Sequence, residues 1–141
     1  MLFDQALNIP DILSSEALTV SLIGEKVRYN LRLKSSDLSK IKKATGLKLP
    51  SKMNASSIGK DITCVKLGPD EWVLIANPTQ ADKLEISLMK ISKDYICSVT
   101  DISHRNVAFT IAGDDASKLL NIGCPLDLSL DAFPVGKATR T

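Results

Sequence analysis

Apolar and polar residues alternate along residues 27–33, which read Val-Arg-Tyr-Asn-Leu-Arg-Leu. A period of two predicts a half-buried strand whose apolar side chains share one face. After the polar residues 35–37, which can cap a helix start, apolar residues recur at helical spacing from Leu38. We expect this helix to end at Gly46, because glycine adopts the left-handed cap conformation, and Pro50 prevents its continuation. A strand, a short basic helix and a loop are therefore expected in succession.

Two apolar runs on either side of a turn indicate a hairpin in the middle of the chain. The runs are residues 62–67 and 72–76, and the Gly-Pro-Asp-Glu sequence between them is typical of a turn. The second run is almost continuously apolar, so we expect a central strand covered on both faces, with Trp72 as a core anchor. Residues 53–59 are expected to form a polar loop, and residues 79–91 a helix with one apolar face.

The same order of features returns about 80 residues later. A strand is expected at residues 95–99, and apolar and polar residues alternate again at 107–111. A polar turn, a short helix with an apolar face, Gly123 and Pro125 follow, as in the first half of the chain. The pattern predicts an α+β fold with two β-α-β-β-α repeats, the first over about residues 27–91.

The second repeat, from about residue 107, is expected to be truncated. The first repeat includes a hairpin and a closing helix, whereas the sequence ends at residue 141, where the second hairpin would begin. We expect an N-terminal arm over residues 1–15 and a single domain over residues 16–141. The open sheet edge and the uncovered apolar face are expected to be covered by a partner chain, a second copy or a rearranged terminus.

The composition is typical of a soluble globular domain. Its 141 residues are 44% hydrophobic and 24% charged, which excludes disordered, collagen-like and low-complexity chains. No apolar run approaches the roughly 20 residues that cross a bilayer, and the N-terminus lacks the basic region of a secretory signal. Three cysteines favour a reducing compartment over a disulfide framework. We therefore expect a cytoplasmic protein without a membrane partner.

Positive charge is concentrated in one part of the chain. Residues 26–60 contain ten Lys or Arg and one acid, whereas the remaining residues contain eight Lys or Arg and fifteen acids. Such a stretch can face an acidic partner surface, an anionic ligand or simply solvent. Nucleic acid is not expected as a partner, because Tyr29 is the one aromatic residue in the stretch and is assigned to the core.

Candidate catalytic residues are few. The one histidine is His104, and no Cys-x-x-Cys pair occurs, so no metal site is expected; Cys64 and Cys97 lie in strand patterns and are expected to be buried. Ser103 and His104 are adjacent, so their side chains diverge in an extended backbone and a nucleophilic triad is not expected. We expect His104 and Arg105 to make structural or interface hydrogen bonds, or Arg105 to bind a carboxylate. The glycines form neither a dinucleotide-binding fingerprint nor a P-loop.

Four runs of sequence carry a family resemblance. Residues 67–75, Leu-Gly-Pro-Asp-Glu-Trp-Val-Leu-Ile, look like the hairpin signature of the folate-binding aminomethyltransferase, or T-protein-like, superfamily. The other runs are Val-Thr-Asp-Ile-Ser-His-Arg-Asn-Val-Ala-Phe at 99–109, Gly-Cys-Pro-Leu-Asp-Leu at 123–128 and Phe-Pro-Val-Gly-Lys-Ala-Thr-Arg-Thr at 133–141. Together they resemble the gamma subunits of heterotetrameric sarcosine oxidase, over about residues 25–141.

The resemblance implies a folate-binding T-protein-like fold and membership of an enzyme complex. The family's gamma subunit joins alpha, beta and delta subunits in an enzyme that oxidatively demethylates sarcosine to glycine and hydrogen peroxide, with one-carbon transfer to tetrahydrofolate. The resemblance implies FAD, FMN and NAD on alpha and beta, zinc on delta, tetrahydrofolate on alpha and no cofactor on this chain. The chain departs from the family at Lys137 and Ala138, where a small residue and a cysteine are usual, and members usually continue past the last motif.

The role implied for this chain is that of a noncatalytic subunit that supports assembly of an oxidoreductase acting on CH–NH donors. No catalytic residue is carried over, and no cofactor-binding residue is assigned. We expect partner subunits or an anionic ligand to be contacted by His104, Arg105 and Arg140. In the absence of the other subunits, the chain is alternatively expected to form a homo-oligomer that covers its exposed apolar face. The alternative function is a free-standing folate-binding or one-carbon protein, in which Arg105 or lysines of residues 26–60 bind the glutamate carboxylates of folate.

Overall fold

The computed structural model describes residues 13–34 and 38–141. The chain forms two compact units. The first unit comprises Met1–Gly24, His104–Phe133 and Thr141, and the second comprises Glu25–Ser103 and Pro134–Arg140. Within the described ranges, no helix is both long and apolar enough to span a membrane.

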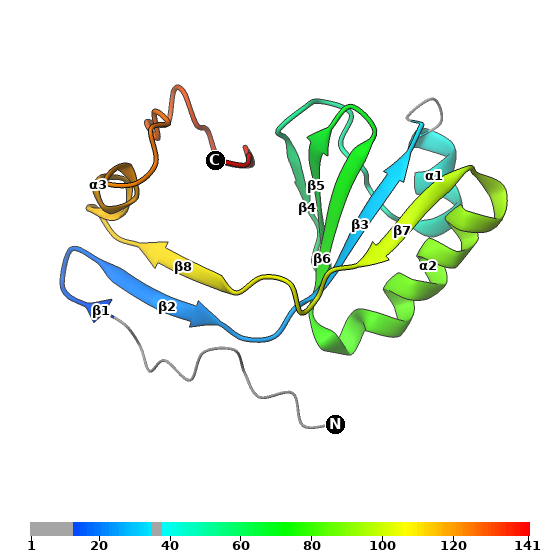
Figure 1. Cartoon of the computed structure of the whole chain (residues 1–141), viewed down its shortest axis with the longest axis horizontal. Helices are drawn as coiled ribbons and strands as arrows, with labels where there is room; N and C mark the ends of the chain where they lie inside the picture. The colour runs from blue at the N-terminus through cyan, green and yellow to red at the C-terminus, as the bar shows by residue number, and fades with distance from the viewer. Residues whose placement is uncertain (1–12, 35–37) are drawn as a thin grey trace. The chain divides into compact units, whose positions relative to one another are not determined.

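The second unit is an antiparallel five-stranded sheet with two helices (Figure 1). Its strands, in the order β4-β5-β6-β3-β7, are Ser56–Ile58, Ile62–Gly68, Glu71–Ala76, Val27–Leu33 and Cys97–Asp101. Its helices are α1 (Leu38–Thr45), the 3-10 turn η2 (Pro78–Gln80) and α2 (Ala81–Asp94). The strand expected at 27–33, the central hairpin and the two helices of this region are therefore confirmed, whereas the cap residues 35–37 lie outside the described part of the chain.

One continuous core lies between the sheet and its two helices. Alternate residues of β3 and β6 supply the sheet side of the core, and every third or fourth residue of α2 supplies the helix side. The buried cluster comprises Tyr29, Leu31, Leu33, Ile41, Leu47, Leu49, Cys64, Trp72, Leu74, Ala76, Leu84, Leu88 and Ile91. Trp72 is fully buried and donates from Nε1 to the carbonyl of Pro50 at 2.9 Å, which confirms it as a core anchor.

Two expectations about this sheet are wrong. Val73 and Ile75, on the face of β6 opposite the core, are only half-buried, so this central strand is covered fully on one face rather than both. The loop expected at 53–59 contains β4, which pairs with β5 through Ser56, Ser57 and Ile58. Its sequence is too short and polar to show a strand period, and the neighbouring strand supplies the pairing.

The C-terminal segment of the second unit runs along β4. Ser56 donates its N–H to the carbonyl of Gly136 at 2.7 Å, and Ala138 donates its N–H to the carbonyl of Asn54 at 2.8 Å. An antiparallel bridge joins Ala55 to Lys137. Backbone groups at the edge of the sheet are therefore paired by this segment, as edge strands require.

The first unit is an antiparallel three-stranded sheet and one short helix. Its strands, in the order β1-β2-β8, are Leu13–Ser14, Thr19–Ile23 and Ala108–Ala112, and its helix α3 is Ala116–Asn121. Gly113 follows β8 with φ +112°, and an added Cβ would lie 2.3 Å from the carbonyl oxygen of Ala17, so only glycine fits there. None of the described side chains of this unit is buried.

The fold is α+β, as expected, and its second strand–helix pair, β8 and α3, occurs where the sequence indicates one. Leu13 and Ser14 of the expected arm form β1, and residues 1–12 lie outside the described ranges. The truncated second repeat and the single domain over 16–141 stay predictions.

Candidate functional site

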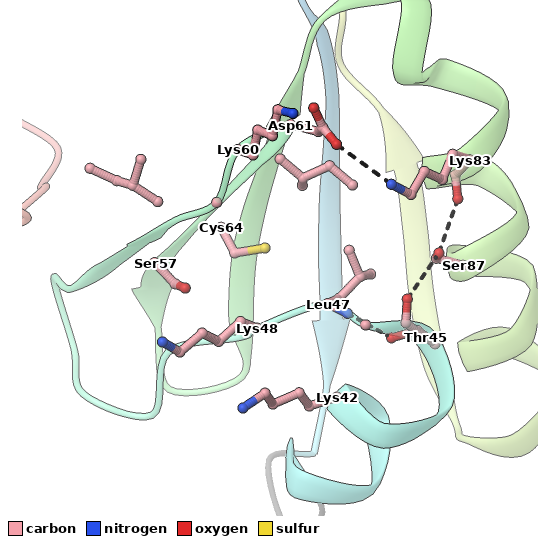
Figure 2. Close-up of a pocket in the computed structure, with 14 residues that line it drawn as sticks. Lys42, Thr45, Leu47, Lys48, Ser57, Lys60, Asp61, Cys64, Lys83 and Ser87 are labelled. Carbon is pink, nitrogen blue, oxygen red and sulfur yellow. Dashed lines mark hydrogen bonds and ion pairs between the residues drawn. The ribbon is translucent and has the colours of Figure 1, made fainter.

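An open pocket of about 360 Å³ lies in the second unit between the end of α1, the β4–β5 hairpin and the first half of α2 (Figure 2). Its wall combines apolar side chains and hydroxyl groups with a ring of charge. The charged residues that line it are Lys42, Lys48, Lys60, Lys83 and Asp61. The pocket therefore carries a net charge of three positive at neutral pH.

Local chain geometry directs two of these lysines into the pocket. Lys42 lies in the last turn of α1, which ends at Gly46 with φ +76° as the sequence predicts. The backbone after the helix is extended: Leu47 and Leu49 are buried on one side, so Lys48 between them points to the other side. Figure 2 shows the Lys42 and Lys48 side chains extending toward the same end of the pocket.

The other end of the pocket holds an ion pair. Lys83 Nζ lies 3.6 Å from Asp61 Oδ2, with Lys60 beside them in Figure 2. Lys42, Lys48 and Lys60 have no ion-pair partner among the residues that the structure describes. Of the four pocket lysines, only Lys83 is therefore paired with the pocket carboxylate in the described part of the chain.

The floor of the pocket includes the sulfur of Cys64, which is buried as expected. Burial raises the pKa of the Cys64 thiol to about 12, and the backbone N–H of Lys48, which hydrogen-bonds the sulfur, offsets only part of that rise. The thiol is therefore protonated at neutral pH and packs as a small apolar group rather than acting as a nucleophile. Cys97, also expected to be buried, is half-buried.

A second charged cluster surrounds Glu71 at the start of β6. The buried carboxylate accepts hydrogen bonds from Arg140 Nη2 at 2.6 Å, Arg140 Nη1 at 3.2 Å and Asn30 Nδ2 at 2.7 Å. Arg32, its cross-strand partner, adds an ion pair at 3.4 Å. The Arg140 hydrogen bonds, then that of Asn30, lower the pKa of Glu71 to about 2 against the opposing effect of burial. This cluster fastens the C-terminal segment to the sheet.

The residues that the sequence singled out fall in different parts of the molecule. His104 and Arg105 are exposed and belong to the first unit, whereas Arg140 belongs to the second and is bound to Glu71. The Ser103 hydroxyl donates to Asp101 Oδ1 at 2.5 Å and accepts from the N–H of Arg28 at 3.0 Å. Ser103 therefore ties the end of β7 to β3. Contacts of His104, Arg105 and Arg140 with a partner or ligand stay predictions.

The pocket was only partly visible in the sequence. Lys42, Lys48 and Lys60 lie in the basic stretch 26–60, but nothing distinguishes them there from the other basic residues. Lys83 and Asp61 were missed, because they lie on elements that meet only in the folded chain. Within the described ranges, no three His, Cys, Asp or Glu side chains gather closely enough to hold a metal ion.

Two solved structures contain a chain whose fold is similar to that of this protein. The chain is similar to a chain of the heterotetrameric sarcosine oxidase from Corynebacterium sp. U-96 in complex with pyrrole 2-carboxylate, with 25% identity and a TM-score of 0.73. The match covers 92% of this chain and 67% of that chain. It is also similar in fold to the glycine cleavage system aminomethyltransferase T from Bartonella henselae, with 16% identity and a TM-score of 0.59, over 75% of this chain and 32% of that one.

Sequence comparison gives a family. The family described as sarcosine oxidase, gamma subunit, matches residues 34–141. No curated protein matches the chain significantly. The expected resemblance to sarcosine oxidase gamma subunits and the T-protein-like fold are both confirmed.

Proposed function

The chain belongs to the sarcosine oxidase gamma subunit family, and we propose that it is a noncatalytic subunit that supports assembly of a sarcosine oxidase complex. The observation that carries this proposal is the family match over residues 34–141, together with a similar fold over 92% of the chain. In the proposed complex, alpha, beta and delta subunits hold FAD, FMN, NAD, tetrahydrofolate and zinc, and sarcosine is demethylated there.

The surface of the first unit supports a role in assembly. Among its described residues, large apolar side chains are exposed on β8, on α3 and in the segment that follows: Phe109, Leu120, Ile122 and Leu130. Ile122 is 84% exposed. A sheet and helix without a buried side chain gain hydrophobic stabilisation when a partner covers them. We propose that this apolar surface, defined by those four residues, contacts another subunit.

The bonding of the candidate reactive groups supports a noncatalytic role. The Cys64 thiol is protonated and buried in the second unit. The Ser103 hydroxyl is hydrogen-bonded to Asp101, and the Arg140 guanidinium to Glu71. Each of these groups has a structural partner that accounts for its position.

The test is co-purification. The tagged full chain, co-expressed with the flavin-containing large subunit and the other subunits, is expected to retain bound flavin on an affinity column, measured by absorbance. Purification of the tagged chain alone from that strain would contradict the proposal. Micromolar binding of tetrahydrofolate by the isolated chain, measured by titration calorimetry, would instead favour the free-standing folate-binding alternative.

A matched pair of variants locates the contact surface. Phe109→Asp places a charge on the apolar surface of the first unit and is expected to abolish flavin retention. Met89→Asp places the same charge on the exposed face of α2, and retention is expected to be unchanged. Equal loss from both variants would contradict the proposed location while leaving the proposed membership of the complex intact.

A further inference from the structure

We propose that the pocket between α1, the β4–β5 hairpin and α2 binds a small organic dianion that bridges its two cationic ends. This site goes beyond the proposed role in assembly and does not depend on it. The ligand's anionic groups are carboxylates or phosphates, which offer the same acceptor chemistry to ammonium donors.

The pocket concentrates positive charge at both of its ends. Lys42 and Lys48 extend to one end of the pocket, and Lys60 lies at the other beside the Lys83–Asp61 pair (Figure 2). Like charges gathered in one concave surface repel, and low-dielectric walls strengthen that potential. A ligand with two negative charges offsets most of the net charge of three positive.

The structural uses of lysine account for little of this cluster. A lysine near a helix C-terminus can bind its free carbonyls, but two carbonyls near the end of α1 have other donors. The N–H of Gly46 donates to the Lys42 carbonyl at 2.8 Å, and Thr45 Oγ1 donates to the Ile41 carbonyl at 2.7 Å. Ser87 Oγ, from α2, donates to the Lys83 carbonyl at 3.0 Å and lies 3.5 Å from the Thr45 carbonyl. Among the described residues, neither the Lys42 nor the Lys48 ammonium group binds a carbonyl of this helix.

The helix dipoles also explain the positions of few of these lysines. It stabilises a positive charge at the end of α1, which accounts for Lys42 alone. Lys83 lies in the first turn of α2, where the dipole disfavours a positive charge, and Lys60 lies outside both helices. Ligand binding is the use that the pocket lysines share.

The shape of the wall favours a dianion with separated charges. The pocket volume of about 360 Å³ lies in the lower part of the range of small-molecule sites. Leu47, Ile62 and Cys64 present apolar atoms on the wall, and Ser57 adds a hydroxyl. A short carbon chain can lie against the apolar atoms while its two anionic groups reach the opposite ends.

The experiment is a titration of the full chain with two probes, adipate and pyrophosphate, at constant ionic strength, followed by amide chemical shifts in NMR. Adipate carries two separated carboxylates, whereas pyrophosphate carries adjacent phosphates and about three negative charges at pH 7. Tighter binding of adipate is therefore expected, and tighter binding of pyrophosphate would show that charge rather than separation governs binding and would contradict a bridging ligand. Saturable shifts are expected at residues 46–48 and 57–61. Equal shifts with acetate, or shifts confined to other residues, would overturn the proposal.

Three lysine variants complete the test. Lys48→Ala and Lys60→Ala, one at each end, are each expected to weaken the apparent Kd about fivefold. Lys43→Ala removes the same charge from α1 outside the pocket and is expected to leave the Kd unchanged. An equal effect of Lys43→Ala, or no effect of Lys60→Ala, rejects a bridging ligand. All three side chains are exposed, so thermal unfolding is expected to be unaltered.

Discussion

The two units of this chain both place a strand before a helix, yet among the described residues only the second unit encloses a core. In the second unit, Trp72 is fully buried beneath α1 and α2, whereas in the first unit Phe109 remains 41% exposed on β8. The helices differ in length: α2 has 14 residues and α3 has six. A helix of fewer than two turns offers little apolar surface to a sheet. The second unit therefore buries its large apolar side chains against its own helices, whereas the described part of the first unit leaves such side chains exposed.

The largest expected effect compares one aromatic residue from each unit. Trp72→Ala is expected to lower the free energy of unfolding by about 3–5 kcal/mol, because it leaves a cavity at a fully buried site. Phe109→Ala is expected to cost less than about 1 kcal/mol in the isolated chain, because its ring is partly hydrated already. Urea unfolding measures both. Similar losses would show that the first unit has a core of its own.

A glycine substitution is expected to act on the first unit alone. Gly113→Ala forces a side chain onto the Ala17 carbonyl at a backbone conformation of φ +112° and is expected to cost about 2 kcal/mol. Hydrogen exchange is expected to accelerate in β2 and β8, with β3 and β6 unchanged. Gly24→Ala is the control, because an added Cβ there meets no atom within 4 Å. Faster exchange throughout the chain would mean that the two units unfold together.

The Glu71 cluster predicts a pH dependence in the second unit. Its pKa is lowered from 4.5 to about 2, so the folded state binds fewer protons than the unfolded state between these values. The stabilisation is full above pH 4.5 and is lost as the pH falls toward 2. Arg140→Ala removes the strongest cause of the shift and is expected to cost about 1 kcal/mol at pH 7, because its side chain is 60% exposed.

The measurement is urea unfolding of wild type and Arg140→Ala at pH 7 and pH 3. The difference between the two proteins is expected to shrink at pH 3, because Glu71 is then almost fully protonated in the unfolded state. Arg105→Ala, which removes an exposed arginine of the first unit, is expected to show no such dependence. A constant difference at both pH values would show that Arg140 stabilises the fold by packing alone.

The smallest effect on stability concerns the pocket. Asp61→Asn breaks an exposed ion pair and is expected to change the free energy of unfolding by less than about 0.5 kcal/mol. It also removes the one carboxylate among the charged lining groups, so dianion binding is expected to strengthen about threefold. Amide shifts on adipate titration measure that change, with Asp70→Asn as a control outside the pocket. Weaker binding by Asp61→Asn would mean that the carboxylate positions Lys83 for the ligand.

Much of the second unit was predictable because its signals are local. The alternation at 27–33 matches β3, and the apolar runs around the Gly-Pro-Asp-Glu turn match β5 and β6. Gly46 ends α1 with a positive φ, as its position after the helical pattern indicates. The strand β4 was not predictable in this way, because Ser-Ser-Ile has no period of its own and depends on β5 for its hydrogen bonds.

Local patterns in the sequence predicted most of the strands and helices of the second unit, and the sequence motifs indicated the family, whereas β4 and the half-exposed face of β6 were not predicted. Folding alone decided which distant residues meet. Arg140 and Glu71 are 69 positions apart, and Lys83 reaches Asp61 from a different element of the sheet-and-helix unit. Periodicity arises from the backbone geometry of a few neighbouring residues, whereas a charge cluster depends on how the chain returns to itself, so no local pattern contains it.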